Sequence, residues 1–411
     1  MKQLPYNNSI CIKPWSHLYI LPDGTVRPCC IMRDIDKNSL GNLKERSLKD
    51  MWNSPKMMQL RKDMLEDKKP SMCEKCYRHE AAGLGSVRMH SNNNFLEELK
   101  EVPSYTETNG YSNKFDLIFW DFRFSNKCNL KCRSCGPDAS SAWVPDAKKL
   151  SKNHAEREKI TKCEFVDGKV NIDFVKEHID KVKYIYFAGG EPLIMDEHYE
   201  ILDMLVKSNN TSCRLYYNTN LQILSYNGYN VLDYWHKWTN KTLTISPSID
   251  EIGERAELVR KGTDWKRTEN NLLTLIKAGF NVRPNITTGA LNVFRLPEII
   301  TYFYENGILD KQQSYRNFNI NIIDYPQHLH IRALPDAFKQ ETKIKIINFI
   351  ESFEKTTGCE IRLRFSYALQ LLDEPHVPEW KDTFIHFNKQ LDDIRGESLY
   401  ETIPELKIMI G

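Results

Sequence analysis

The sequence has little net charge and no long hydrophobic run. Its 57 lysines and arginines nearly balance its 55 aspartates and glutamates, which leaves a net charge of +2. That balance gives no electrostatic footprint for nucleic acid or an anionic membrane. No apolar stretch approaches the roughly 18 to 20 residues of a membrane helix, and the first eight residues lack the apolar core of a signal peptide. We therefore expect a cytoplasmic protein with no membrane partner.

Several catalytic signatures are also missing. The sequence shows no internal repeat, no low-complexity tract, no Gly-rich phosphate loop and no Ser-His-Asp arrangement. It therefore identifies no catalytic base, and the catalytic residues stay unknown. The composition is that of a globular protein, with 41% hydrophobic and 27% charged residues. A length of 411 residues suggests two or three domains.

Cysteine, by contrast, is abundant, with 11 residues. In a reducing compartment these residues are not expected to form a disulfide framework. Eight of them lie in two groups, one near the start of the chain and one further along. The others, Cys163, Cys213 and Cys359, are scattered and are expected to be ordinary buried thiols. Two clusters of cysteines in a cytoplasmic protein indicate metal binding.

The pattern along the chain suggests four segments: a first domain at 1–95, a linker at 96–113 rich in Pro, Ser, Thr, Asn and Gly, an α/β domain at 114–330, and a helical extension at 331–411. The first domain should contain a hairpin, with strands at 17–20 and 26–30 around the turn Pro22-Asp23-Gly24-Thr25. A helical pattern follows Ser47, and Pro55 should break or restart it.

Six candidate strands alternate with amphipathic segments of helical length; they are residues 115–125, 183–188, 214–220, 243–250, 281–291 and 317–324. This alternation predicts parallel strands joined by helical crossovers, in an open sheet or an incomplete barrel. Polar residues recur on one face, as with Asp121, Arg123 and Ser125. That pattern favours a barrel whose inner face lines a wet cavity. Edge strands that face solvent are the alternative.

Cys128, Cys132 and Cys135 lie in a short loop directly after the first of these strands. Thiolates that bind one small metal centre need such close spacing. A structural zinc site requires four ligands, and no fourth cysteine or histidine follows near this loop. A four-iron cluster held by three cysteines would leave one iron open to a cofactor. A zinc site completed by a distant ligand is the alternative.

This loop resembles that of the radical S-adenosylmethionine (SAM) superfamily, in which three cysteines follow the first strand of a partial (β/α)6 barrel. Ser134 departs from the aromatic residue often found before the third cysteine. Residues 188–192, Ala-Gly-Gly-Glu-Pro, resemble the family's GGEP motif, and the resemblance covers about residues 114–325. It implies SAM contacts at the strand ends, from Gly189, Gly190, Glu191, Pro192, Asn218, Asn220, Ser246, Ser248 and Asp250.

Arg260 lies near the next helix and would hold the SAM carboxylate as a bidentate donor; an exposed surface arginine is the alternative. For Asn218 and Asn220 the alternative is a bond to turn backbone. The resemblance further implies that SAM binds the open iron of a [4Fe–4S] cluster. One-electron reduction, by a donor such as flavodoxin or ferredoxin, would then give a 5′-deoxyadenosyl radical that takes a hydrogen atom from a substrate.

The early cysteines Cys11, Cys29, Cys73 and Cys76 form a second set of four ligands, for which the spacing leaves zinc and iron–sulfur open. Together with Pro14-Trp15, Asp23-Gly24 and Trp52-Asn53-Ser54, they resemble the twitch domain, a shortened relative of the SPASM domain. The resemblance implies an auxiliary cluster, also of the [4Fe–4S] kind, in a domain that here precedes the barrel. Cys30 competes with Cys29, and the Pro-Cys match favours Cys29.

The resemblance implies a radical SAM oxidoreductase or transferase. Relatives with twitch and SPASM domains act on peptide or protein side chains, on aminoglycosides and on nucleotides, and a peptide or protein side chain is the favoured substrate. The alternative is modification of a nucleotide, a nucleic acid or a sugar. A hypothesis of another class is a non-catalytic zinc-binding interaction module, which gives no account of Glu191 or of the polar strand faces.

Overall fold

The computed structural model describes residues 8–32, 35–81, 83–161, 169–310 and 318–411. Cys163 and the first residue of the sixth predicted strand lie outside this part. The chain forms two compact units. The first contains residues 1–125, 164–189 and 197–215, and the second contains residues 126–163, 190–196 and 216–411. Among the described helices, none has the length and apolar character needed to cross a membrane.

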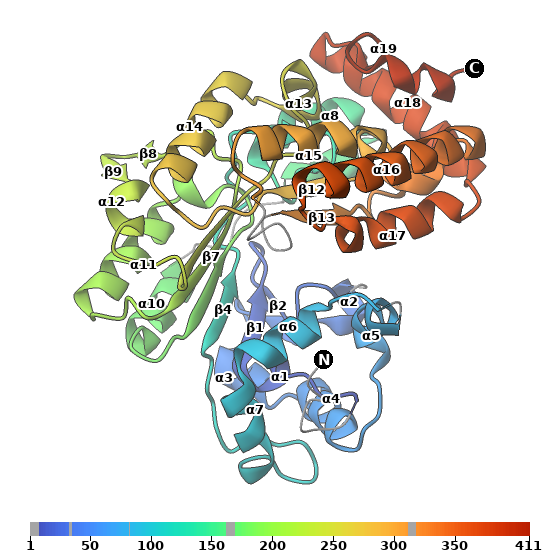
Figure 1. The fold of residues 1–411 in the computed structure, drawn as a ribbon. Helices are drawn as coiled ribbons and strands as arrows, with labels where there is room; N and C mark the ends of the chain where they lie inside the picture. Colours follow the sequence, from blue (N-terminus) through green and yellow to red (C-terminus); the bar gives the residue numbers. More distant parts are fainter. Residues whose placement is uncertain (1–7, 33–34, 82, 162–168, 311–317) are drawn as a thin grey trace. The chain divides into compact units, whose positions relative to one another are not determined.

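The sheet of the first unit is built around β1 (His17–Ile20). This strand pairs antiparallel with β2 (Thr25–Arg27), which confirms the predicted hairpin, and parallel with β4 (Phe119–Phe122) (Figure 1). Outside them lie β3 (Gly41–Asn42), beside β2, and β6 (Tyr184–Phe187), parallel to β4. The N-terminal hairpin and the first strand of the α/β segment thus share one sheet.

Helices surround this sheet; they are α1 (Lys13–Ser16), α2 (Ile35–Asn38), α3 (Leu48–Trp52), α4 (Pro55–Leu65), η1 (Ser71–Cys73), α5 (Glu74–Ala81), α6 (Val87–Asn94), α7 (Leu96–Glu101), η2 (Val102–Ser104), α10 (Lys169–His178) and most of α11 (Asp196–Lys207). A capping box between Ser47 and Asp50 begins α3, and Pro55 begins α4, as predicted. The segment expected to be a linker differs from the prediction, because it contains α7 and η2.

Successive residues of β4 face opposite sides of the sheet, as in any strand. Trp120 and Phe122 pack on Phe174 of α10. Phe119 contacts the ring of His17 on β1 instead. The polar residue between these aromatics, Asp121, is fully buried on the side of Phe119. One face of β4 is therefore apolar, while the other carries a buried polar group. The strand is also shorter than the predicted strand at 115–125.

The parallel strands continue in the second unit. The unit boundary falls within β7 (Arg214–Thr219), and β10 (Leu243–Pro247), β12 (Asn285–Thr288) and β13 (Asn319–Ile322) follow. β12 and β13 are parallel, and parallel bridges connect β10 to the segment of β12. With β4 and β6, all six predicted strands are present in the expected order. The α/β class with mainly parallel strands, as expected for a partial (β/α)6 barrel, is confirmed.

The second unit contains two further strand pairs, β5 (Lys131–Cys132) with β11 (Arg260–Lys261) and β8 (Ser225–Tyr226) with β9 (Tyr229–Asn230). Its helices are η3 (Ser141–Trp143), α8 (Val144–Leu150), α9 (His154–Thr161), η4 (Pro192–Ile194), α12 (Val231–Trp235), α13 (Glu254–Val259), α14 (Trp265–Lys277), η5 (Val293–Arg295), α15 (Leu296–Glu305), η7 (Gln327–Leu329) and η8 (Ile331–Ala333).

The predicted helical extension is present at the end of the chain. It consists of α16 (Asp336–Thr357), α17 (Arg362–Asp373), α18 (Pro378–Arg395), α19 (Leu399–Thr402) and η9 (Pro404–Met409). In Figure 1 these helices are coloured orange to red. α16 packs on α15 and α17, and α18 packs on α8, which follows the loop of three cysteines. The extension is therefore part of the second unit and contacts the neighbourhood of the candidate site.

Candidate functional site

The loop of three cysteines is held by a short strand pair that the sequence did not predict. β5, which contains Cys132, pairs antiparallel with β11 and places Arg260 directly opposite Cys132. The indole Nε1 of Trp143 donates to the carbonyl of Cys132 at 2.7 Å. Cys132 is buried, whereas Cys128 and Cys135 are partly exposed. The loop backbone is thus anchored while two of its thiols remain near the surface.

The three thiols share one positively charged neighbour. A hydrogen bond between Cys132 and Cys135 lowers the pKa of Cys132 to about 7 and raises that of Cys135 well above the ordinary value. Burial raises the pKa of Cys128 to about 11. Arg260 acts on all three in the same direction, because its charge lowers each pKa. A cation in this position favours the thiolate form that binds metal.

Arg260 is itself fixed by a buried carboxylate. Its Nη1 lies 2.8 Å from Oδ2 of Asp250, and Oδ1 of Asp250 accepts from the backbone N–H of Thr287 at 2.7 Å. The Arg260 side chain is only 14% exposed, so it is not the surface arginine that was the alternative. Two residues predicted to contact SAM therefore form one ion pair beside the cysteine loop.

Glu191, in the motif that resembles GGEP, is enclosed by hydrogen-bond donors. Its carboxylate accepts from the hydroxyl of Thr219 at 2.7 Å and from the backbone N–H groups of Asn220 at 2.6 Å and Leu193 at 3.2 Å. Burial raises the pKa of Glu191, and these hydrogen bonds act against the rise. The carboxylate thus ties the start of η4, which begins at Pro192, to the end of β7.

The two glycines before Glu191 have backbones that other residues rarely adopt, with φ of +84° at Gly189 and +57° at Gly190. A Cβ on Gly190 would lie 2.4 Å from the carbonyl oxygen of Lys127. On Gly189 it would lie 2.5 Å from Cδ of Arg123. Both positions require glycine for their conformation and for space.

The remaining predicted SAM contacts lie at the ends of β7 and β10. Asn220 donates to Oδ1 of Asn129 in the cysteine loop at 2.8 Å and also accepts from the backbone of Gln222, the turn contact that was its alternative. Asn218 and Ser248 are partly exposed. Ser246 is fully buried, and its hydroxyl has no hydrogen-bond partner among the described residues. In the second unit, the structure brings Asn220, Asp250 and Arg260 together around the cysteine loop.

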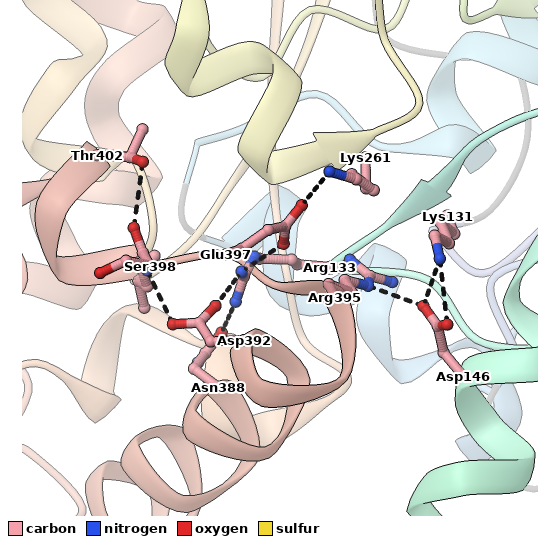
Figure 2. A network of polar contacts seen from close by, with 11 residues as sticks. Lys131, Arg133, Asp146, Lys261, Asn388, Asp392, Arg395, Glu397, Ser398 and Thr402 are labelled. Carbon is pink, nitrogen blue, oxygen red and sulfur yellow. Dashed lines mark hydrogen bonds and ion pairs between the residues drawn. The ribbon is translucent and has the colours of Figure 1, made fainter.

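The C-terminal helix α18 holds the same loop through a buried network of charges that the sequence analysis missed (Figure 2). Arg133, the residue after Cys132, is fully buried. It pairs with Asp392, donates to Oε2 of Glu397 at 2.9 Å and donates to Oδ1 of Asn388 at 2.8 Å. Arg133 could be seen within the cysteine motif, but a local sequence pattern does not predict hydrogen-bond partners more than 250 residues away.

The network has a second branch and also extends to β11. Oε1 of Glu397 lies 2.8 Å from Nζ of Lys261, the neighbour of Arg260. On the other side, Asp146 of α8 pairs with Lys131 at 3.0 Å and with Arg395 of α18 at 2.8 Å (Figure 2). The end of the α18 segment is therefore linked to both strands that place Arg260 opposite Cys132, to β11 through Glu397 and to β5 through Asp146.

The early cysteines meet in the first unit. Cys11 precedes α1, Cys29 follows β2, and η1 and α5 carry Cys73 and Cys76. All four line one apolar cavity together with Lys13, Pro14, Pro28, Ile31, Met32, Met64, Met72, Val87 and Arg88. Among the described residues of this lining Cys29 is present and Cys30 is not. Four thiols around a shared apolar space suit a cluster with four cysteine ligands.

Burial favours the protonated form of three of these thiols, Cys11, Cys73 and Cys76, when no metal is bound. It raises the pKa of Cys11 to about 11, and it also raises the pKa values of Cys73 and Cys76. Within the described residues, no three Cys, His, Asp or Glu side chains are arranged to hold a single metal ion. The ligands of a four-iron cluster bind different iron atoms. Cys213 and Cys359 are buried, as predicted.

Comparisons with known proteins match the two segments that contain the cysteine groups. The iron–sulfur cluster-binding domain SPASM matches residues 11–77, and the radical SAM superfamily matches residues 122–295. A GTP 3′,8-cyclase of Campylobacter curvus (strain 525.92) is 25% identical over 227 residues, which are 54% of this chain and 60% of that protein. GTP 3′,8-cyclase 3 of Mycobacterium tuberculosis (strain CDC 1551 / Oshkosh) is 33% identical over 87 residues, or 21% and 19%. The chain thus spans at most 60% of these curated relatives.

Two solved structures are similar at low identity. Streptococcus suis SuiB bound to S-adenosylmethionine is 14% identical, with 68% of this chain and 58% of that chain covered and a TM-score of 0.38. The enzyme anSMEcpe with bound AdoMet is 16% identical, with 58% and 61% covered and a TM-score of 0.38. The two family matches contain both cysteine groups: the chain has a segment that matches the radical SAM superfamily and, on its N-terminal side, an iron–sulfur cluster-binding domain of the SPASM type.

Proposed function

We propose that this protein is a radical SAM enzyme that cleaves S-adenosylmethionine reductively and abstracts hydrogen from a substrate. The observation that supports this most is the loop of three cysteines with Arg260 directly opposite Cys132, where its positive charge favours the thiolate form of each cysteine. When bound there, a [4Fe–4S] cluster and SAM supply a 5′-deoxyadenosyl radical, which is the reactive species. The protein's part is to hold, orient and shield these groups.

In this proposal Cys128, Cys132 and Cys135 bind three irons and leave the fourth for SAM. Gly189 and Gly190 stay proposed backbone contacts of SAM, at positions where an added Cβ would collide with Arg123 and with the Lys127 carbonyl. The buried hydroxyl of Ser246, which has no partner in the described part of the chain, supports a contact with a bound group. Asn220, Asp250 and Arg260 complete the proposed pocket, and Pro192, Asn218 and Ser248 stay proposed contacts at its strand ends.

The cavity lined by Cys11, Cys29, Cys73 and Cys76 would hold the auxiliary cluster. With four cysteine ligands that cluster is closed, so its proposed role is electron transfer and not substrate ligation. Lys13 is buried in the same lining. Burial lowers its pKa, but the neighbouring Cys29, Cys30 and Asp121 raise it by more, so the side chain remains an ammonium group. A cation there would stabilise a negatively charged cluster.

The substrate class is the finer part of the proposal. A peptide or protein side chain, the class that the resemblance of the sequence favours, is the first candidate. The curated relatives are named as GTP 3′,8-cyclases, and this supports the second candidate, a nucleotide. An external one-electron donor such as flavodoxin or ferredoxin is part of either version.

Anaerobic purification followed by metal analysis tests the proposal. Two four-iron clusters predict roughly eight irons per chain and broad absorption near 400 nm. With dithionite and SAM, the protein should release 5′-deoxyadenosine, and Cys132→Ala should not. Cys359→Ala, which removes a buried thiol outside both groups, is the matched control and should keep the activity. A colourless protein with zinc in both cysteine groups would support the interaction module instead.

Deuterium transfer separates the two substrate classes. A deuterated peptide or nucleotide that is the substrate should transfer its label into 5′-deoxyadenosine, whereas a bystander should not. We expect GTP labelled on the ribose to be the informative nucleotide, because it is the compound named for the curated relatives. Absence of transfer from GTP together with transfer from a peptide would decide for the peptide class.

A further inference from the structure

A further set of polar residues lies in the first unit, on one face of β1, β4 and β6. Tyr19 of β1 pairs with Asp121 of β4. Phe119 of β4 pairs with Tyr184 of β6, and Tyr186 lies two residues further on the same face. Because paired residues share a face and side chains alternate, these groups form one row across the sheet. They lie on the face that the sequence predicts to line a cavity.

Asp121 is the most constrained member of this row. Its side chain is fully buried. Oδ1 lies 2.8 Å from Nε of Arg123, and within the described residues neither carboxylate oxygen accepts a hydrogen bond of good geometry. A buried carboxylate is costly unless it is paired and hydrogen-bonded. Asp121 thus adds no hydrogen-bond network to the fold, and its ionic contact is with Arg123.

The planar guanidinium of Arg123, a fork of N–H donors, lies against two aromatic rings. Its guanidinium lies 5.4 Å from the ring centre of Tyr19 and 4.9 Å from that of Tyr186. Gly189 leaves the space for its Cδ, because a Cβ there would lie 2.5 Å away. Burial lowers the pKa of Arg123, but Asp121, Tyr19 and Tyr186 raise it more, so the group stays charged.

The two terminal Nη nitrogens of this guanidinium are the feature that points to a ligand. Asp121 contacts Nε, and it is the one ionic partner of Arg123 among the described residues. The Arg123 side chain is 12% exposed, so its terminal nitrogens are within reach of a ligand. A second arginine lies nearby: the guanidinium of Arg27 is 5.9 Å from the ring centre of Tyr19. Its buried Nε also has no hydrogen-bond partner in the described chain. Two guanidinium groups against one carboxylate leave an excess of positive charge.

We propose that Arg123 binds an oxyanion of the substrate, either a carboxylate or a phosphate, and that Asp121 is the positioning residue that fixes its fork. The planar guanidinium offers parallel N–H donors that match such a group bidentately. The inference rests on the proposed function, because it names a chemical feature of the substrate. It assigns Arg123 to the substrate and leaves the carboxylate of SAM to Arg260.

The test uses the full-length protein, purified anaerobically, and two simple probes at constant ionic strength. Inorganic pyrophosphate represents a phosphate-bearing substrate and succinate a carboxylate-bearing one. We expect the wild type to bind one of them in equilibrium dialysis. Arg123→Lys keeps the charge but lacks the fork, so that probe should bind roughly tenfold more weakly. The affinity for SAM, measured in parallel, should not change.

Two variants complete the design. Asp121→Asn preserves the shape of the side chain and should weaken the same probe while leaving SAM binding intact. Arg267→Lys on α14 changes an arginine that is 59% exposed and should change neither. Should Arg123→Lys fail to fold, phenylglyoxal modification of the wild type gives the same answer. Arg123 should be modified and should be protected by the probe.

Three outcomes would overturn the inference: neither probe binds the wild type, the variants bind the probe as the wild type does, or SAM affinity falls with Arg123→Lys. The last would assign the arginine to SAM. Release of 5′-deoxyadenosine without substrate is measured separately. A protein that cleaves SAM but binds neither probe contradicts only this inference, whereas one that binds a probe and never cleaves SAM contradicts the proposed function.

Discussion

Arg133 of the cysteine loop and Asp392 of α18 form an ion pair in which the arginine side chain has no solvent exposure (Figure 2). The same arginine also contacts Glu397 and Asn388. The loop that would carry the reactive cluster is therefore anchored by the last part of the chain. Because a buried charge without its partner is strongly unfavourable, loop and helix depend on each other for their stability.

Replacing Arg133 by methionine should therefore destabilise the protein and loosen the loop. Removing one partner of a buried ionic network costs about 3 to 5 kcal/mol, since Asp392 would lose its cation and Glu397 would keep only Lys261. Thermal unfolding measures the loss, and the rate at which a chelator removes iron measures the loop. Lys345→Met is the control, because Lys345 and Glu298 form an exposed pair worth at most about 1 kcal/mol. Equal effects of both variants would show that the network does not support the loop.

The two adjacent cysteines after β2 should behave differently. Cys29 lines the cavity of the four early cysteines, so Cys29→Ser should lose the iron of the auxiliary site and keep that of the three-cysteine loop. Cys30→Ser should retain both. Iron content and the electron paramagnetic resonance spectrum of the reduced protein report the difference. Loss of the auxiliary signal in the Cys30 variant alone would exchange the two assignments.

Gly190→Ala should weaken SAM binding more than it weakens the fold. The substitution forces a Cβ to within 2.4 Å of the Lys127 carbonyl, and the backbone conformation adds a strain of about 1 kcal/mol. Gly279→Ala is the matched control, because Gly279 has a φ of +76° and nothing within 4 Å of its added Cβ. Both variants share the backbone strain. Only the first should change the dissociation constant of SAM, measured by equilibrium dialysis.

Glu251 should make stability depend on pH near neutrality. Burial raises its pKa to about 7, although Arg295 acts against the rise. Because the pKa is higher in the folded protein than in the unfolded chain, the stabilising effect is complete at low pH. It is lost as the pH rises to the folded value. The free energy of unfolding should fall by about 1 kcal/mol between about pH 6 and pH 8 relative to Glu251→Gln. Parallel pH profiles for the two proteins would contradict this assignment.

Features encoded in short segments could be predicted from the sequence. The six strands, the hairpin at β1 and β2, the start of α4 at Pro55 and the helix α16 follow from hydrophobic period and turn chemistry, which act over a few residues. The segment at 96–113 was wrongly expected to be a linker. Its proline and polar residues hid the short helix α7, whose Leu99 is buried.

The sequence by itself determined the class of the fold, the two cysteine groups and the glycine-rich turn before Glu191, because ligand spacing and turn conformation are local properties. Only the tertiary structure decided that β1 joins β4, that Arg260 lies opposite Cys132 and that α18 neutralises Arg133. It also decided that Arg123 stacks between Tyr19 and Tyr186. These contacts join segments far apart in the chain, and their existence depends on how whole strands and helices pack, which no local pattern records.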